Sequence, residues 1–180
     1  IQDVSFQAEY TFTRQQAQER LLRVEEKADA VLSTFTKDMD DYEKLKALYE
    51  SVVSGTEYDL QAPENQTICS VFLYGKSVCQ GYAKAFQYLC QKAGIPAVLV
   101  TGTVEDGTPH AWTAVCCSGA WYYADPSWGD ASYQTAGAKE DGAEESGSDP
   151  DGRRDQVDED FCLVATEPIS RPHPDGAPFP

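Results

Sequence analysis

Hydrophobic side chains in the first third of the chain repeat with the period of an α-helix. Apolar residues at positions 13–35 recur three, four and seven places apart, which predicts one long amphipathic helix. A second helix is predicted from Asp40 or Asp41, either of which can cap it, to about Val53, with Gly55 ending it. The predicted inward positions are Leu21, Val24, Ala28, Val31, Leu32 and Phe35 in the first helix and Tyr42, Leu45, Leu48, Tyr49 and Val52 in the second.

The pattern changes after residue 56. Residues 57–63 are predicted to form a loop and residues 67–74 a short helix that leads to a turn at Gly75. A third helix is predicted to begin at Cys79 and to stop before Gly94 and Pro96, which are typical helix-ending residues. Its apolar face is formed by Ala83, Phe86, Cys90 and Ala93.

Strands are predicted in the second half of the chain. Residues 97–104 form a continuous apolar run, which indicates a strand buried on both faces. Residues 109–125 predict two antiparallel strands around a turn at Ser118 and Gly119, and residues 161–165 predict one more strand. Helices followed by an antiparallel sheet define an α+β fold, in which the helix that carries Cys79 packs on the sheet.

A long stretch differs in kind from the rest. Residues 130–160 hold eleven acidic and three basic residues among 31, a net charge of −8 that is half of the chain's −16. This stretch has no apolar periodicity, so we expect a flexible acidic insert. The whole chain is predicted to be a single domain of six parts: an arm (1–12), helices (13–54), a catalytic core (64–129), the insert (130–160), a strand (161–166) and a Pro-rich tail (167–180).

The predicted hairpin brings a histidine and a carboxylate together. With a tight turn at Ser118-Gly119, Cys117 pairs with Ala120, and His110 and Asp125 become diagonal neighbours on one face of the sheet. Such neighbours lie roughly 7–8 Å apart at the backbone, within reach of their side chains. A turn one residue longer would separate them, and a lone histidine can also be a structural residue.

Cys79 is placed where a thiol can be activated. A helix N-terminus presents unpaired N–H groups and a positive dipole end, which favour the thiolate and lower the thiol pKa. By itself, a cysteine at a helix start is more often a small buried hydrophobic residue. The chain has only two histidines, and His173 lies in the Pro-rich tail, so His110 is the well-placed candidate for a base.

Four sequence blocks in this order resemble the transglutaminase-like superfamily of papain-type cysteine enzymes. They are Gly-Lys-Ser-Val-Cys79-Gln-Gly-Tyr-Ala-Lys-Ala-Phe, Ala93-Gly-Ile-Pro-Ala-Val-Leu-Val-Thr-Gly, His110-Ala-Trp and Trp121-Tyr-Tyr-Ala-Asp125-Pro-Ser-Trp. The resemblance covers roughly residues 40–130, with a weaker match at 160–171. It implies a papain-like core and a triad in which Cys79 is the nucleophile, His110 the general base and acid, and Asp125 the residue that orients His110.

Further site residues are less well defined by the sequence. The N–H of Cys79 is expected to donate to an oxyanion, and a second donor remains open among Gln66, Tyr74 and Gln80. Aromatic side chains near the predicted strands could form the walls of a cleft, although core packing is the simpler role for them. These residues are Trp112, Tyr123 and Trp128.

Composition excludes several classes of function. A net charge of −16 argues against binding to nucleic acid or to anionic membrane surfaces, and no apolar run is long enough to span a bilayer. The six cysteines follow neither a disulfide framework nor a zinc-site spacing, and the acidic positions do not match a calcium loop, so we predict no metal and no cofactor. Most of the cysteines are expected to be buried thiols.

The function predicted from these features is acyl transfer through a thioester intermediate on peptide or related amide bonds. Hydrolysis is favoured, which would make the protein a peptidase or an amidase that acts on a peptide or protein substrate. A protein-glutamine transglutaminase is the alternative, and a binding or cell-surface scaffold without turnover is a second one.

Similar family members are bacterial and often exported, and the chain begins at Ile1 rather than Met. We therefore expect an extracytoplasmic or cell-surface protein whose export signal is absent from this chain, although a cytoplasmic one remains open. The oligomeric state is not predicted.

Overall fold

The structure is a computed structural model, and it describes residues 10–104, 107–130 and 162. Its helices and strands follow the order α1 (Arg14–Leu32), α2 (Asp41–Ser54), β1 (Glu57–Tyr58), η1 (Ser70–Tyr74), β2 (Lys76–Ser77), α3 (Cys79–Lys92), β3 (Ala97–Thr103), β4 (Pro109–Cys117) and β5 (Ala120–Ala124). The mixed composition of helices and an antiparallel sheet confirms the predicted α+β fold. The strand predicted at residues 161–165, apart from Cys162, and the acidic insert after Asp130 lie outside the described residues.

Both N-terminal helices begin at reciprocal caps. Thr13 accepts from the backbone of Gln16 and the Gln16 side chain accepts from the backbone of Thr13, and Asp40 and Glu43 repeat this arrangement at α2. The prediction of the caps is therefore confirmed for α2, where Asp40 is the residue used. Four of the five inward positions predicted for α2 are buried, and they are Leu45, Leu48, Tyr49 and Val52.

Two predicted inward positions are wrong. Leu21 of α1 is 50% exposed and Tyr42 of α2 is 47% exposed. Helix α1 lies on the outside of the molecule and packs against η1 and α2 on one side only, so its fully buried residues are Val24 and Ala28. Tyr42 belongs to the first turn of α2, before that helix passes over the core.

The segment between α2 and α3 is more ordered than the sequence predicts. The predicted loop at 57–63 begins with β1, which pairs in parallel with β2, so this part of the prediction is wrong. The two strands cover two residues each, too few to show a period in the sequence. The predicted short helix is a single π-helical turn, η1, and Gly75 ends it in the left-handed region with a φ of 65°.

A buried polar cluster holds the start of α3. The Ser77 hydroxyl donates to the carbonyl of Asn65 at 2.7 Å and lies 2.6 Å from the hydroxyl of Ser70. Gly81 packs on the same cluster, because a Cβ at this position would lie 1.9 Å from the Ser77 oxygen. Helix α3 therefore begins at Cys79 as predicted, and its first turn is fixed in place by the preceding loop.

The three-stranded sheet has the order β3-β4-β5 and is antiparallel throughout. Cys117 pairs with Ala120 and Thr113 with Ala124, which confirms the register predicted from the Ser118-Gly119 turn. The prediction that β3 is buried on both faces is wrong. Only Ala97 is fully buried, because β3 is an edge strand of the sheet among the described residues and extends beyond the helices that cover the sheet.

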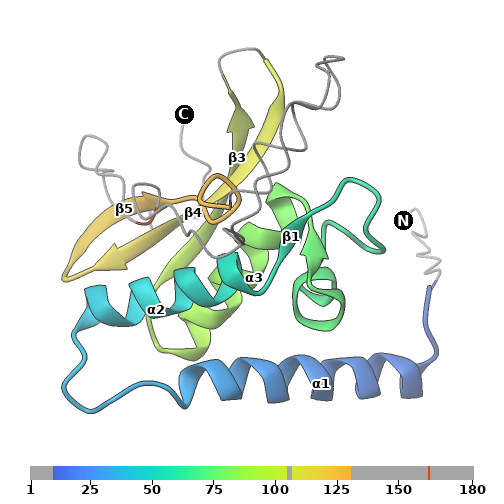
Figure 1. Cartoon of the computed structure of the whole chain (residues 1–180), viewed down its shortest axis with the longest axis horizontal. Helices are drawn as coiled ribbons and strands as arrows, with labels where there is room; N and C mark the ends of the chain where they lie inside the picture. Colours follow the sequence, from blue (N-terminus) through green and yellow to red (C-terminus); the bar gives the residue numbers. More distant parts are fainter. Residues whose placement is uncertain (1–9, 105–106, 131–161, 163–180) are drawn as a thin grey trace, which may run out of the picture.

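Helix α3 lies between the sheet and the other helices (Figure 1). One side of α3 packs on β4 and β3, and the other side packs on α2. The core includes Tyr49, Tyr82, Phe86, Leu89 and Val115, none of which is exposed. Within the described part of the chain, no helix combines the length and apolarity needed to cross a membrane.

One boundary of the predicted acidic insert needs correction. Asp130, which we assigned to the insert, is buried, and its carboxylate accepts a hydrogen bond from the buried hydroxyl of Tyr82 on α3. Cys162 is also buried and belongs to the same hydrophobic core as Cys90. The chain is therefore attached to the core at residues 130 and 162. A composition count could not reveal this, because it treats Asp130 like any other acidic residue.

Candidate functional site

Cys79 is the first residue of α3 and is half-buried. The residue before it, Val78, is the N-cap and offers no side-chain hydrogen bond, so the helix start is not closed by a polar side chain. The backbone N–H groups of Gln80 and Ala111 hydrogen-bond to the sulfur of Cys79, and so does the side chain of His110. The sulfur thus lies among donors that favour its anionic form.

His110 connects Cys79 to Asp125. Its Nε2 lies 2.6 Å from Oδ2 of Asp125, and both side chains are buried. Because Nε2 faces the carboxylate, the other ring nitrogen, Nδ1, is the atom left for the hydrogen bond with Cys79. The predicted proximity of His110 and Asp125 is therefore confirmed, and the structure also brings Cys79 to the same imidazole.

The electrostatics of the pair favour a thiolate and an imidazolium. Burial alone raises the pKa of Cys79, but the hydrogen bond and charge of His110 and the N–H groups of Ala111 and Gln80 lower it further, so the net pKa is below its ordinary value. Burial alone lowers the pKa of His110, but the hydrogen bonds to Asp125 and Cys79 and their charges raise it to about 9. His110 is therefore protonated at neutral pH, and its positive charge favours the thiolate form of Cys79.

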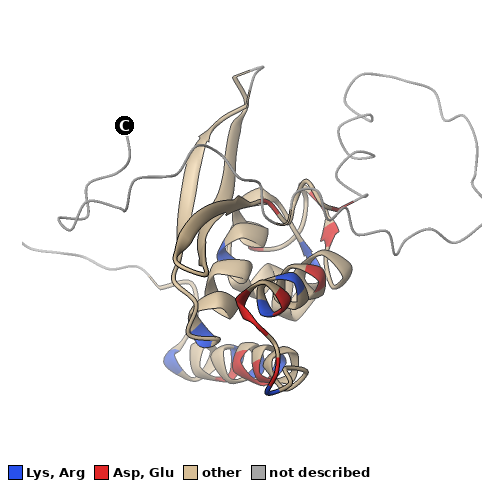
Figure 2. Cartoon of the chain, turned by 90° about the vertical axis from the view of Figure 1, so that its left-hand side faces the viewer, with Lys and Arg blue, Asp and Glu red and all other residues tan. Residues whose placement is uncertain are grey.

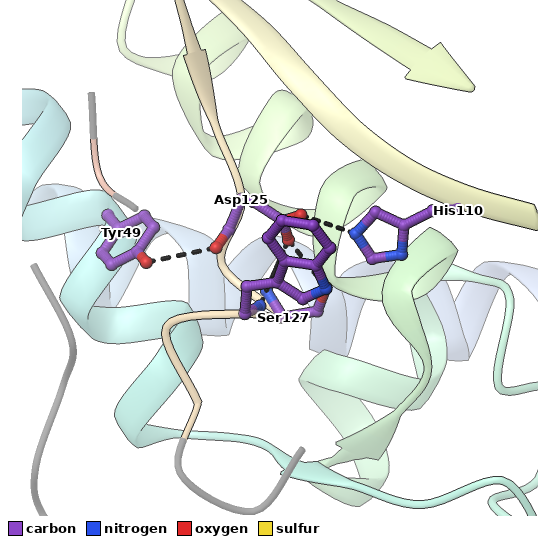
Figure 3. Close-up of polar contacts among 5 residues, drawn as sticks. Tyr49, His110, Asp125 and Ser127 are labelled. Atoms are coloured by element: carbon purple, nitrogen blue, oxygen red, sulfur yellow. Dashed lines mark hydrogen bonds and ion pairs between the residues drawn. The ribbon is translucent and has the colours of Figure 1, made fainter. Parts of the chain in front are cut away.

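A second set of contacts fixes the carboxylate of Asp125. Its Oδ1 accepts from the Ser127 hydroxyl at 2.7 Å, from the Ser127 N–H at 3.1 Å and from the Trp128 N–H at 3.3 Å. The backbone carbonyl of Asp125 accepts from the Tyr49 hydroxyl at 3.1 Å. Figure 3 shows Tyr49 and His110 on opposite sides of Asp125. The aspartate is therefore held by groups that leave Oδ2 for the imidazole.

Neither Ser127 nor Tyr49 was predicted to belong to the site, and Tyr49 was expected only as a core residue. A signal for Ser127 exists, because an aspartate followed two residues later by serine is typical of a turn in which the carboxylate caps the backbone. Tyr49 carries no comparable local signal. It lies 76 residues before Asp125 and reaches it only through the packing of α2 in the core.

The predicted cleft-wall aromatics lie around the imidazole. The rings of Trp128 and His110 are stacked with centroids 4.9 Å apart, and those of Trp112 and His110 are stacked at 5.9 Å. The ring of Tyr123 lies edge-on to that of Trp112, with the two centroids 5.9 Å apart, so Tyr123 is linked to the imidazole through Trp112. An indole face attracts a cation, so two such faces favour the protonated imidazole and keep water from it.

The candidates for a second oxyanion donor are differently placed. Gln80 directly follows Cys79, and its backbone N–H already points to the sulfur. Gln66 is exposed, and its carbonyl accepts from Lys84 of α3 at 3.0 Å. Tyr74 is turned toward α1, where its hydroxyl accepts from Arg20 at 3.1 Å. The geometry therefore favours Gln80 over Tyr74, and the choice of Gln66 stays a prediction.

The cysteines form no disulfide bond in the structure. Cys90, Cys117 and Cys162 are buried, while Cys69, Cys79 and Cys116 are partly exposed, so half of them, rather than most, are buried thiols. Burial raises the pKa of Cys90 and of Cys117, which keeps these two protonated and unreactive. Among residues 10–104, 107–130 and 162, His, Cys, Asp and Glu side chains form no group of three that could hold a metal ion.

Known proteins resemble the chain in the segment that contains this site. The family model of the transglutaminase-like superfamily matches residues 28–126. Kyphoscoliosis peptidase of Mus musculus is 27% identical over 111 residues, which cover 53% of this chain and 17% of that protein. The human protein of the same name is 26% identical over the same shares. The chain thus spans 17% of the length of the curated relatives that it matches.

Solved structures also share the fold. A crystal structure described as a TGase has a TM-score of 0.54 and 19% identity, and the match covers 78% of this chain and 37% of that one. A structure from Cytophaga hutchinsonii, described as a candidate cysteine protease, has a TM-score of 0.50 and 22% identity, and covers 59% of this chain and 38% of that one. At these identities the similarity supports the fold and does not extend to the reaction.

Proposed function

The chain belongs to the transglutaminase-like superfamily, and on this basis we propose that it is a cysteine-dependent acyl-transfer enzyme for peptide or related amide bonds. Cys79, His110 and Asp125 are its catalytic triad. One observation carries the proposal. The sulfur of Cys79 is hydrogen-bonded to His110, whose other ring nitrogen lies 2.6 Å from Asp125, and this arrangement lowers the pKa of the thiol and raises that of the imidazole.

The first half of the reaction forms an acyl-enzyme. The thiolate of Cys79 attacks the amide carbonyl carbon, and the carbonyl oxygen becomes an oxyanion that the N–H groups at the start of α3 stabilise. When the tetrahedral intermediate collapses, the C–N bond breaks and the imidazolium of His110 gives its proton to the leaving amine. A thioester on Cys79 and a neutral imidazole remain.

The second half returns the enzyme to its starting state. Neutral His110 takes a proton from water, and the resulting hydroxide attacks the thioester carbon. The C–S bond then breaks, which releases a carboxylic acid and restores the thiolate beside the imidazolium. A primary amine in place of water would give a new amide, which is the reaction of a transglutaminase. We favour hydrolysis because water reaches any partly exposed thioester, whereas an amine needs a site of its own.

The test is a mass-spectrometric assay with glutamine-containing peptides, in the presence and absence of a primary amine. Backbone cleavage, side-chain deamidation and amine incorporation each give a different product mass. We expect a hydrolytic product that disappears in Cys79→Ala and persists in the matched control Cys69→Ala, which removes another partly exposed thiol. Amine incorporation that outcompetes hydrolysis would make the protein a transglutaminase. No product from any peptide, with Cys79 intact and folded, would favour the binding scaffold.

A further inference from the structure

The sheet has two faces, and only one of them carries the core. Helix α3 covers one face of the sheet, where the hydroxyl of Thr113 donates to the carbonyl of Ala83 in α3. The buried side chains on this face are those of Ala97, Thr113, Val115, Cys117 and Ala124. The alternate positions form the opposite face, which we call the outer sheet face. It consists of Val98 and Val100 of β3, Trp112, Ala114 and Cys116 of β4, and Trp121 and Tyr123 of β5, and His110 of β4 lies at its end.

None of the described helices covers the outer sheet face (Figure 2). Val98 is 38% exposed, and the aromatic side chains of Trp112, Trp121 and Tyr123 are partly exposed. Ala114, at the centre, is nevertheless only 1% exposed, because its cross-strand neighbours Val98 and Tyr123 flank it. The outer face is thus a continuous layer of apolar side chains rather than a set of scattered ones.

Apart from His110 at its end, the outer sheet face carries no charged side chain. Strands β3, β4 and β5 contain no Asp, Glu, Lys or Arg, although the chain as a whole has a net charge of −16. Figure 2 shows the three-stranded sheet without charged residues, whereas charged residues of both signs lie on the helices and the segments around them. Exposed apolar patches of this kind are uncommon on isolated soluble domains and mark sites of interaction.

Contacts between rings join this face to the proposed active site. Trp112 belongs to the outer sheet face and also stacks on the imidazole of His110 at 5.9 Å. Tyr123 meets Trp112 edge-on, and the ring of Trp112 lies so close to Gly102 that a Cβ there would be 2.8 Å from it. A polypeptide whose amide reaches Cys79 can therefore continue onto this face without crossing a charged surface.

We propose that the outer sheet face is the docking surface for the substrate polypeptide, and that it selects apolar or aromatic side chains within a few residues of the reacting amide. This inference rests on the proposed function and names its substrate class. The occupant is a substrate segment rather than a second copy of the chain, because the apolar surface continues to the imidazole. A copy docked over Trp112 would cover the site that the substrate must enter. Trp121 and Tyr123 are the specificity-determining residues, since they lie on the face and do not contact His110 in the way that Trp112 does.

The experiment separates docking from turnover. All three tryptophans of the chain lie on this face or beside His110, so intrinsic tryptophan emission reports on the site alone. Folded Cys79→Ala protein is titrated with two matched peptides, one with Phe and one with Ala next to a glutamine. The titration is repeated with Trp121→Thr and Tyr123→Thr added, since threonine keeps the strand propensity. Thr101→Val, on the other face of β3, is the matched control.

We expect the Phe peptide to bind about tenfold more tightly than the Ala peptide, as is usual for one apolar side chain in an apolar site. Trp121→Thr and Tyr123→Thr should abolish that preference, and Thr101→Val should keep it. Equal binding of the two peptides, or a preference that survives both substitutions, would overturn the proposal. A dimer seen by sedimentation that Trp121→Thr dissociates would also overturn it. If the preference is found but the parent protein turns over no peptide, docking stands and the proposed catalysis fails.

Discussion

At the scale of single residues, the proton on His110 determines when the enzyme can work. The thiolate of Cys79 exists above its lowered pKa, and the imidazolium exists below a pKa of about 9. Alkylation needs only the thiolate, whereas turnover also needs a proton for the leaving amine. We predict that alkylation of Cys79 becomes fast at a lower pH than for an ordinary thiol and stays fast at alkaline pH, while turnover declines as pH rises through about 9.

The control for this prediction is His110→Ala. Removing the imidazolium takes away the charge and the hydrogen bond that stabilise the thiolate, so the pKa of Cys79 should rise. Alkylation rates measured against pH for the parent and the variant test this directly. If both proteins show the same titration at the ordinary pKa of a thiol, Cys79 and His110 do not form an ion pair.

Ser127 is the second residue whose role can be tested singly. Its hydroxyl donates to Oδ1 of Asp125 at 2.7 Å, and a hydrogen bond to a charged group contributes about 1.5–3 kcal/mol. Two backbone N–H groups remain on Oδ1 in Ser127→Ala, so we predict a loss of turnover of about tenfold, smaller than that of Asp125→Asn.

A positioning role for Ser127 has a signature of its own. A carboxylate that is less well aligned holds the imidazolium less firmly, so the alkaline decline of turnover should move to lower pH in Ser127→Ala. Ser54→Ala, which removes a hydroxyl bonded to the carbonyl of Glu50 far from the site, should change neither quantity. An unchanged pH profile in Ser127→Ala would reduce Ser127 to a structural residue.

The residue scale also shows which parts of the site a sequence can predict. The register of one hairpin placed His110 beside Asp125, because a tight turn fixes every pair that follows it. The helix start alone did not identify Cys79, because a cysteine there is more often a buried hydrophobic residue, and its role as nucleophile was implied by the resemblance of four ordered sequence blocks. Tyr49 could not be found in this way, because the contact depends on how α2 packs.

At the scale of elements, the start of α3 packs closely on the buried polar cluster of Ser77, Ser70 and Asn65. Alanine is a better helix former than glycine by about 1 kcal/mol, so propensity alone favours Gly81→Ala. Packing opposes it, because the new Cβ would lie 1.9 Å from the Ser77 oxygen and 2.7 Å from the Asn65 carbonyl. Overpacking of this kind costs about 1–3 kcal/mol, and the backbone carbonyl cannot move away easily. We predict a net loss of stability and of turnover.

Gly94→Ala is the matched comparison for α3. Gly94 ends the same helix with a φ of 78° and has open space around its Cβ direction. Its substitution should cost about 1–2 kcal/mol through backbone strain and leave turnover per folded molecule unchanged. Thermal unfolding and activity of the two variants test both statements. If Gly81→Ala is as active as Gly94→Ala, the position of Cys79 does not depend on this contact.

The same scale explains where the sequence prediction of elements failed. An apolar run such as residues 97–104 does not say whether its strand is central or at an edge, since both patterns can be continuous. The order β3-β4-β5 decides this, and it leaves the positions of β3 beyond Ala97 partly or fully exposed. The apolar residues that seemed to predict burial, Val98 and Val100, instead belong to the outer sheet face.

At the scale of the whole molecule, composition alone places the start of the acidic segment at Asp130, one residue before the position that the structure supports. The carboxylate of Asp130 accepts from the Tyr82 hydroxyl, and both residues are buried, so Asp130 belongs to the core. Removing one partner of a buried hydrogen bond costs about 1–3 kcal/mol. A stretch with almost no apolar side chains, by contrast, has little hydrophobic area to contribute to stability.

The cost of losing the Asp130 carboxylate and the small contribution of the acidic stretch together give a prediction for a pair of chimaeras. In one, residues 131–160 are replaced by a Gly/Ser linker of the same length, and in the other the replacement begins at Asp130. We predict that the first shifts the melting temperature by only a few degrees, on the scale of about 1 kcal/mol, and keeps turnover. The second should unfold at a clearly lower temperature, because the linker offers Tyr82 no carboxylate. In the first chimaera, Tyr82→Phe removes the hydroxyl instead of the carboxylate. This substitution should lower the melting temperature of the first chimaera to about that of the second. Equal melting temperatures for the pair, measured under identical conditions, would show that Asp130 contributes nothing to the core.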